Sequence, residues 1–73
     1  MQETQMKTFL DVLNLLKRYD IYVHLGNRLW DIELAAIEID NMARAGLIQP
    51  KEYAQIKLVL QHEHESETKR QEY

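Results

Sequence analysis

Apolar residues recur at helical spacing in three stretches of the chain, over residues 8–20, 29–46 and 50–65. Spacings of three and four residues place side chains on one face of a helix, because an α-helix has about 3.6 residues per turn. The apolar faces of the first and third stretches consist of Phe9, Val12, Leu13, Leu16 and Tyr19, with Leu15 at the edge, and of Tyr53, Ile56, Val59 and Leu60. The pattern predicts an all-α fold, a compact three-helix bundle.

The middle stretch differs from the other two because it has two apolar faces. One broad face contains Ile32, Ala35, Ala36, Ile39, Met42 and Ala43, and the opposite face contains Trp30, Leu34, Ile37 and Ala45. A helix at a protein surface normally has a single apolar stripe. We therefore expect this helix to be covered on two sides, either by two neighbours in the same chain or by one neighbour and a second copy of the protein.

The helix ends carry recognisable signals. Thr8, with Asp11 three residues later, resembles a capping box. Gly46 follows the last periodic residue of the middle helix and can take the left-handed conformation that closes a helix. Pro50 suits the first position of the third helix, because its missing N–H is not needed there.

The segment between the first two helices is expected to be an ordered loop. Ile21, Tyr22 and Val23 are β-branched or aromatic and disfavour a helix. A turn is expected at Gly26 and Asn27. Because a lone strand cannot form a sheet, we expect an extended loop that packs through Ile21, Val23 or Leu25.

The length of 73 residues allows one domain, and the 45% hydrophobic fraction is enough for a small core. We predict a flexible N-terminus over residues 1–7, a three-helix domain over residues 8–65 and a frayed polar tail over residues 66–73. The chain has no cysteine, no signal-peptide core and no apolar run of membrane-spanning length. We therefore expect a cytoplasmic protein.

Charge is unevenly distributed along the chain. Residues 1–30 contain four bases and three acids, whereas residues 31–65 contain three bases and seven acids. A basic surface must therefore come mainly from the first half, where cations and rings lie close together in the sequence: Lys17, Arg18, Tyr19, Tyr22, His24, Arg28 and Trp30. Single-stranded nucleic acid needs cations for its phosphates and flat rings for its bases. The pattern favours weak, salt-sensitive binding of single-stranded RNA or DNA through Lys17, Arg18, Tyr22, His24 and Arg28.

The same residues allow a purely structural interpretation. The rings of Tyr19, Tyr22 and Trp30 could belong to the core, and Arg28 could pair with a nearby acid such as Asp31, Glu33 or Glu52. The alternative function is a protein–protein or homodimerisation module. It would use the second face of the middle helix, Trp30, Leu34 and Ile37, if that face is exposed.

The residues needed for catalysis are missing from the sequence. Ser66 is the only serine, cysteine is absent, and the two glycines stand alone. His62 and His64 are two residues apart, whereas histidines that bind one zinc ion from a helix are four apart. A helix-turn-helix over residues 31–65 is disfavoured by its seven acids. We expect neither a metal nor a cofactor, and a binding protein rather than an enzyme.

Two runs of residues resemble the YqgQ-like family of small bacterial proteins: IYVHLGNRLWDIEL at 21–34, and GLIQPKEY at 46–53 followed by LVL. The matching positions are Ile21, Tyr22, Gly26, Arg28, Asp31, Ile32, Glu33, Leu34, Gly46, Leu47, Ile48, Glu52 and Tyr53. The likeness covers roughly residues 8–62. Asp20 stands where the family usually has glycine, one additional residue lies between Tyr22 and Gly26, and Ala36 and Ile37 replace an acidic pair. The resemblance implies a compact three-helix fold and single-stranded nucleic-acid binding, without catalytic residues.

Overall fold

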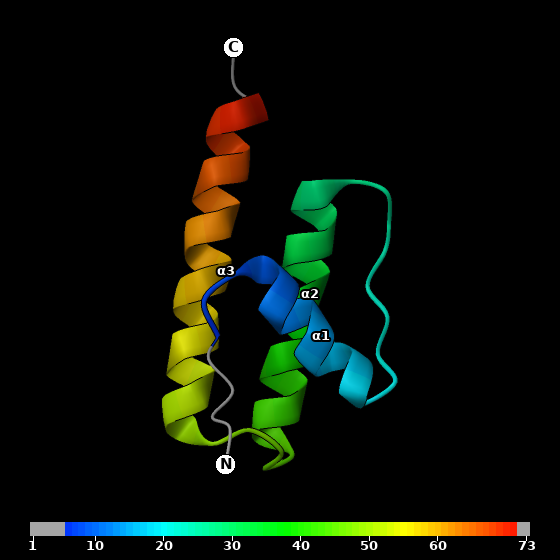
Figure 1. The fold of residues 1–73 in the computed structure, drawn as a ribbon, viewed down its shortest axis with the longest axis vertical. Coiled ribbons are helices and arrows are strands. Elements are labelled where there is room, and N and C mark those ends of the chain that lie inside the picture. Colours follow the sequence, from blue (N-terminus) through cyan, green and yellow to red (C-terminus); the bar gives the residue numbers. More distant parts are fainter. Residues whose placement is uncertain (1–5, 72–73) are drawn as a thin grey trace.

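The computed structural model describes residues 6–71. These residues form three helices, α1 (Phe9–Arg18), α2 (Arg28–Arg44) and α3 (Pro50–Gln71), and no strand. Helices α2 and α3 are antiparallel neighbours, and α1 crosses one side of the pair (Figure 1). The predicted all-α three-helix bundle is confirmed. The C-terminal turns of α3 extend beyond the start of α2, which helps give the molecule its extents of 43 × 22 × 20 Å.

The helix starts are stabilised by the side chains that the local sequence places there. The Thr8 hydroxyl accepts a hydrogen bond from the Asp11 N–H (3.2 Å), and the Asp11 carboxylate accepts from the Thr8 N–H (3.1 Å). The capping box is therefore present. The pKa of Asp11 is lowered, because the backbone N–H groups of Lys7 and Thr8 stabilise its charged form. Asn27 caps α2 by accepting from the Trp30 N–H (3.1 Å), and Pro50 begins α3 as predicted.

Helix α2 ends in a Schellman motif, in which a left-handed residue lets two backbone N–H groups fold back onto the last turn. The Leu47 N–H donates to the Met42 carbonyl (3.0 Å), and the Gly46 N–H donates to the Ala43 carbonyl (3.1 Å). Gly46 has φ +79°. The predicted role of this glycine is confirmed.

Helix α1 ends in the same motif, but without a glycine. The Ile21 N–H donates to the Leu16 carbonyl (3.0 Å), and the Asp20 N–H donates to the Lys17 carbonyl (3.0 Å). Asp20 has φ +62°, the one positive φ of a non-glycine residue between positions 6 and 71. Asp20 therefore adopts a backbone conformation that glycine adopts at lower cost.

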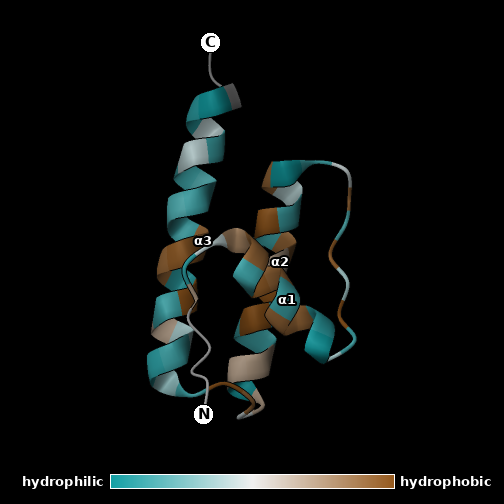
Figure 2. Cartoon of the chain, in the orientation of Figure 1, coloured by the Kyte–Doolittle hydropathy of each residue, from teal (hydrophilic) through white to brown (hydrophobic). Residues whose placement is uncertain are grey.

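The core lies where the three helices meet. It consists of Met6, Phe9, Val12, Leu15, Leu16, Ile32, Ala35, Ile39, Met42, Ile48, Ile56 and Leu60. The C-terminal turns of α3 are hydrophilic by comparison (Figure 2). The predicted core face of α2 is confirmed, since Ile32, Ala35, Ile39 and Met42 are all buried.

Several predicted boundaries and contacts differ from the structure. Helix α3 continues to Gln71, so residues 66–71 are helical instead of forming a frayed tail; residues 72–73 lie outside the described residues, as do 1–5 of the predicted flexible N-terminus. Met6, placed in that N-terminus, is buried in the core. Tyr19 was expected on the core face of α1, but it is exposed because the helix ends at Arg18 and the chain turns away.

Candidate functional site

The loop between α1 and α2 presents alternate side chains to the core and to solvent. Ile21 and Val23 pack against the core, as expected, whereas Leu25 is exposed. Tyr22 and His24 lie between these positions in the sequence and are exposed, Tyr22 by 68%. This alternation is typical of an extended backbone, in which successive side chains point to opposite sides.

The end of this loop is held to α2 by hydrogen bonds. The Leu25 N–H donates to the Asp31 carboxylate at 2.6 Å, and Asn27 caps the helix two residues later. Asp31 therefore holds the loop backbone and is not an ion-pair partner of Arg28. An exposed ring on a loop with both core contacts and a fixed end loses less conformational entropy on binding than one on a free loop.

The predicted nucleic-acid residues form a strip and not a compact cluster. Lys17 and Arg18 lie in the last turn of α1, Tyr22 and His24 on the loop, and Arg28 in the first turn of α2. The loop runs alongside α2, so the two basic ends of the strip are far apart (Figure 1). We call Lys17, Arg18, Tyr22, His24 and Arg28 the basic–aromatic strip. An elongated strip suits an extended ligand better than a compact one.

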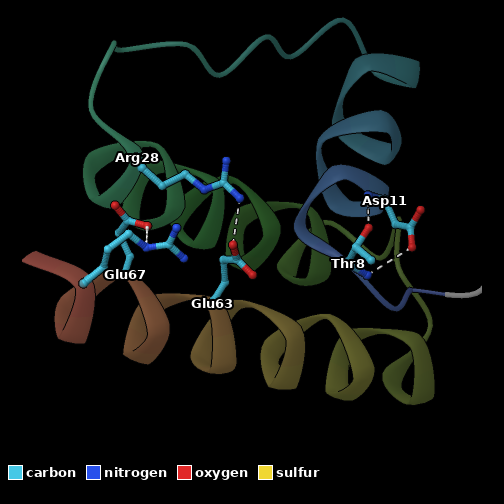
Figure 3. A network of polar contacts seen from close by, with 6 residues as sticks. Thr8, Asp11, Arg28, Glu63 and Glu67 are labelled. Carbon is cyan, nitrogen blue, oxygen red and sulfur yellow. Dashed lines mark hydrogen bonds and ion pairs between the residues drawn. The ribbon is translucent and has the colours of Figure 1, made fainter.

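The side chain of Arg28, in α2, contacts both of the other helices. Its guanidinium donates to the Glu63 carboxylate of α3 at 2.7 Å and lies 5.0 Å from the centre of the Phe9 ring of α1 (Figure 3 shows the ion pair). The expectation of a structural ion pair is met, but with Glu63 instead of Asp31, Glu33 or Glu52. No pattern in the sequence indicates this partner, because the pairing depends on how far α3 extends alongside α2.

Lys17 and Arg18 differ from Arg28 in this respect. Both side chains are exposed, and neither takes part in an ion pair among the described residues. They also lie at the C-terminal end of α1, where cations oppose the negative end of the helix dipole. These two cations are available to a phosphate without breaking an existing pair.

The second apolar face of α2 is exposed to solvent. Trp30 and Ile37 are exposed by 58% and 56%, and Leu34 is partly buried. Both neighbouring helices pack on the opposite, core-facing side of α2. The expectation that α2 is covered on two sides is therefore not met by residues 6–71, the part of the chain that the structure describes.

A polar group that the sequence did not reveal links α2 to α3. Tyr53 donates its hydroxyl to the Asp40 carboxylate (2.7 Å), and the Lys57 ammonium lies 3.1 Å from the same oxygen. These bonds lower the pKa of Asp40, and the bond to the carboxylate raises the pKa of Tyr53. The two bonds to Asp40 link α2 to α3 outside the hydrophobic core.

A shallow groove between α2 and α3 has a volume of ≈ 240 Å³ and is lined by Ile32, Glu33, Ala36, Lys57, Leu60, Gln61 and His64. Ligand pockets usually have volumes of about 300–1,000 Å³. His64 and Glu33 are paired along its edge at 3.3 Å. Within residues 6–71, no group of three or more histidine or acidic side chains could hold a metal ion. We assign no ligand to this groove.

The described residues define a small three-helix protein with a basic–aromatic strip on its first connecting loop. A family model described as YqgQ-like matches residues 6–66, and the chain belongs to this family. Comparisons with curated proteins and with solved structures give no match. Among the helices in the described range, none is both long enough and apolar enough to cross a membrane.

Proposed function

We propose that this protein is a non-enzymatic, cytoplasmic binding protein that binds single-stranded RNA or DNA weakly through the basic–aromatic strip. The observation that carries the proposal is the position of Tyr22. Tyr22 is 68% exposed and lies on a loop held by core contacts, between the cations of α1 and Arg28 of α2. Base stacking on such a ring contributes about 1–3 kcal/mol per base.

Electrostatics limits the proposed affinity. The chain has a net charge of −3, and residues 31–65 contribute most of its acids. Lys17 and Arg18 can bind phosphates directly, whereas Arg28 must first leave Glu63. Three phosphate contacts to a single strand correspond to a slope of about −2 in a plot of log affinity against log salt. The affinity is then expected to fall roughly 20-fold between about 50 and 200 mM salt.

The test is fluorescence anisotropy of a labelled single-stranded oligonucleotide at both salt concentrations. The double variant Lys17→Glu/Arg18→Glu is expected to abolish binding. Lys51→Glu/Lys69→Glu makes the same change of charge at two exposed residues of α3, outside the strip, and is the matched control. Equal loss of binding in both variants would show a net-charge effect and would refute the strip as the site.

Two further substitutions test the ring. Tyr22→Ala removes stacking and should weaken binding roughly 5- to 150-fold, whereas Tyr22→Phe keeps the flat ring and should bind like the wild type. If Tyr22→Ala binds unchanged, base stacking on the loop is excluded.

The ion pair of Arg28 offers an independent check. Glu63→Gln removes the carboxylate that holds this guanidinium and should strengthen oligonucleotide binding. Glu65→Gln makes the same charge change on the same helix, at an exposed residue that forms no ion pair with Arg28. An equal gain in both variants would mean that Arg28 contributes nothing specific.

A further inference from the structure

The exposed face of α2 is an apolar stripe with acidic residues on both sides. We call Trp30, Leu34 and Ile37 the apolar stripe; the three residues lie within about 60° of one another around the helix axis, at about 100° per residue. The stripe extends over about two helical turns. Trp30 is the only tryptophan of the chain and is 58% exposed. Exposed aromatic side chains of this size are typical centres of protein interfaces.

The borders of the stripe are negatively charged. On the helical wheel Glu33 lies about 60° to one side of Trp30 and Glu38 about 80° to the other. Glu33 is exposed and its ion pair is with His64 of α3, which bears a full charge only when protonated. Arg44, at the far end of the helix, donates to Asn41 (3.1 Å). A partner that covers the stripe therefore meets carboxylates along both edges.

This charge pattern decides between possible occupants. Two copies could pair antiparallel with their Ile37 side chains opposite each other. Residues whose numbers sum to about 74 would then face each other. Glu38 would lie near Glu38 of the other copy, and Glu33 near its Asp40. Like charges in these positions oppose association. The stripe consists of only three side chains, whereas a stable interface buries about 800 Å² on each partner. The stripe alone is therefore too small to hold two copies together stably. Phosphates would be repelled by the same carboxylates, so a nucleic acid fits the stripe poorly.

We propose that the apolar stripe is a docking site for an amphipathic helix of another protein, with lysine or arginine residues on both sides of its own apolar face. Such a helix lays its apolar face along Trp30, Leu34 and Ile37 and pairs its cations with Glu33 and Glu38. The contact covers about two turns and is transient. This proposal is independent of the basic–aromatic strip, since it uses none of the same residues.

The probe is a synthetic amphipathic peptide with a leucine face bordered by lysines, compared with a peptide in which glutamates replace the lysines. Trp30 emission is followed during each titration. The lysine peptide is expected to shift the emission to shorter wavelength as Trp30 becomes buried, and to do so less at high salt. The glutamate peptide is expected to leave it unchanged.

Variants show whether the response comes from the stripe. Ile37→Ala should weaken binding of the lysine peptide at least about fivefold, as expected for a residue at the centre of an interface. Leu58→Ala is the matched control, because Leu58 is 66% exposed on α3 and lies outside the stripe. Glu33→Gln and Glu38→Gln should each weaken binding, whereas Glu65→Gln, which makes the same single charge change on α3, should not.

Several outcomes would overturn the proposal. They are an absent emission shift, equal binding of both peptides, and equal effects of Ile37→Ala and Leu58→Ala. Sedimentation of the protein alone is expected to show a monomer; a dimer lost on Ile37→Ala would assign the stripe to a second copy. Loss of oligonucleotide binding in Ile37→Ala would assign it to nucleic acid, while retained binding keeps the two sites separate.

Discussion

Replacement of Asp20 by glycine is expected to stabilise the protein. Asp20 follows α1 at the position where the Schellman motif requires a left-handed residue, and its φ is +62°. A residue with a Cβ atom is strained there by about 1–2 kcal/mol, less for aspartate than for most residues. The carboxylate also lies next to the negative end of the α1 dipole, which is unfavourable by about 0.3–1 kcal/mol.

The net gain is smaller than the sum of these contributions. Glycine has more conformational freedom in the unfolded chain, which costs about 0.4–1 kcal/mol of folding free energy. We therefore expect Asp20→Gly to raise the free energy of unfolding by about 1 kcal/mol. For a domain of this size the melting temperature should rise by about 4–8 °C.

Thermal and urea unfolding followed by circular dichroism at helical wavelengths measure this gain. Asp20→Asn removes the charge and keeps the Cβ atom, so it should gain only the dipole contribution. Asp20→Ala also keeps the strain and should be less stable than Asp20→Gly. Equal stability of the alanine and glycine variants would refute the argument from backbone strain, because neither variant has the charge and the two differ only in the Cβ atom.

Three further predictions concern stability. Gly46→Ala should lower the free energy of unfolding by about 1 kcal/mol in urea titrations, because Gly46 has φ +79°. A Cβ atom there would meet nothing within 4 Å, so the loss comes from the backbone conformation alone. An unchanged stability would show that the left-handed conformation does not disfavour alanine at this position. Tyr53→Phe should flatten the dependence of melting temperature on pH at both ends. The pKa of Asp40 is lowered in the folded protein, so its bond with Tyr53 stabilises the protein above the unfolded pKa near 3.8 and the stabilisation is lost as the pH falls further. The pKa of Tyr53 is raised in the folded protein, so the stabilisation is present below 10.0 and is lost at higher pH. A variant whose pH profile matches the wild type would contradict this. Ile39→Val should lower the free energy of unfolding by about 0.5–1.5 kcal/mol, because Ile39 is fully buried. Ile37→Val, on the exposed face, should change it by less than about 0.5 kcal/mol. Similar values for the two variants would show that α2 is not oriented as described.

The fold was predictable because local signals agreed with one another. Helical periodicity located all three helices, and Thr8, Gly46 and Pro50 marked ends that the structure confirms. Each signal acts over a few residues, where backbone sterics and capping bonds decide the outcome. The end of α3 was not predictable in this way, because residues after 65 are polar and show no apolar period.

The candidate site was predictable only in part, because its composition is local and its arrangement is not. The loop residues and the apolar residues of the second face of α2 follow from the sequence pattern, but the exposure of that face does not. The partner of Arg28 likewise depends on how α2 and α3 lie side by side. The Asp40–Tyr53 bond depends on the same packing. Contacts between helices are set by the packing of the core, which a one-dimensional pattern does not specify.

Arg28 is the residue at which stability and the proposed binding compete. Its guanidinium contacts the Phe9 ring and the Glu63 carboxylate, and its side chain is 51% exposed. A surface ion pair of this kind contributes about 0–1 kcal/mol, so a phosphate can displace Glu63 at modest cost. The displaced carboxylate stays close to the bound phosphate and opposes it. The proposed site therefore binds mainly through Lys17, Arg18 and Tyr22. The ion pair of Arg28 with Glu63 limits the affinity for a phosphate, and Glu63→Gln should raise that affinity.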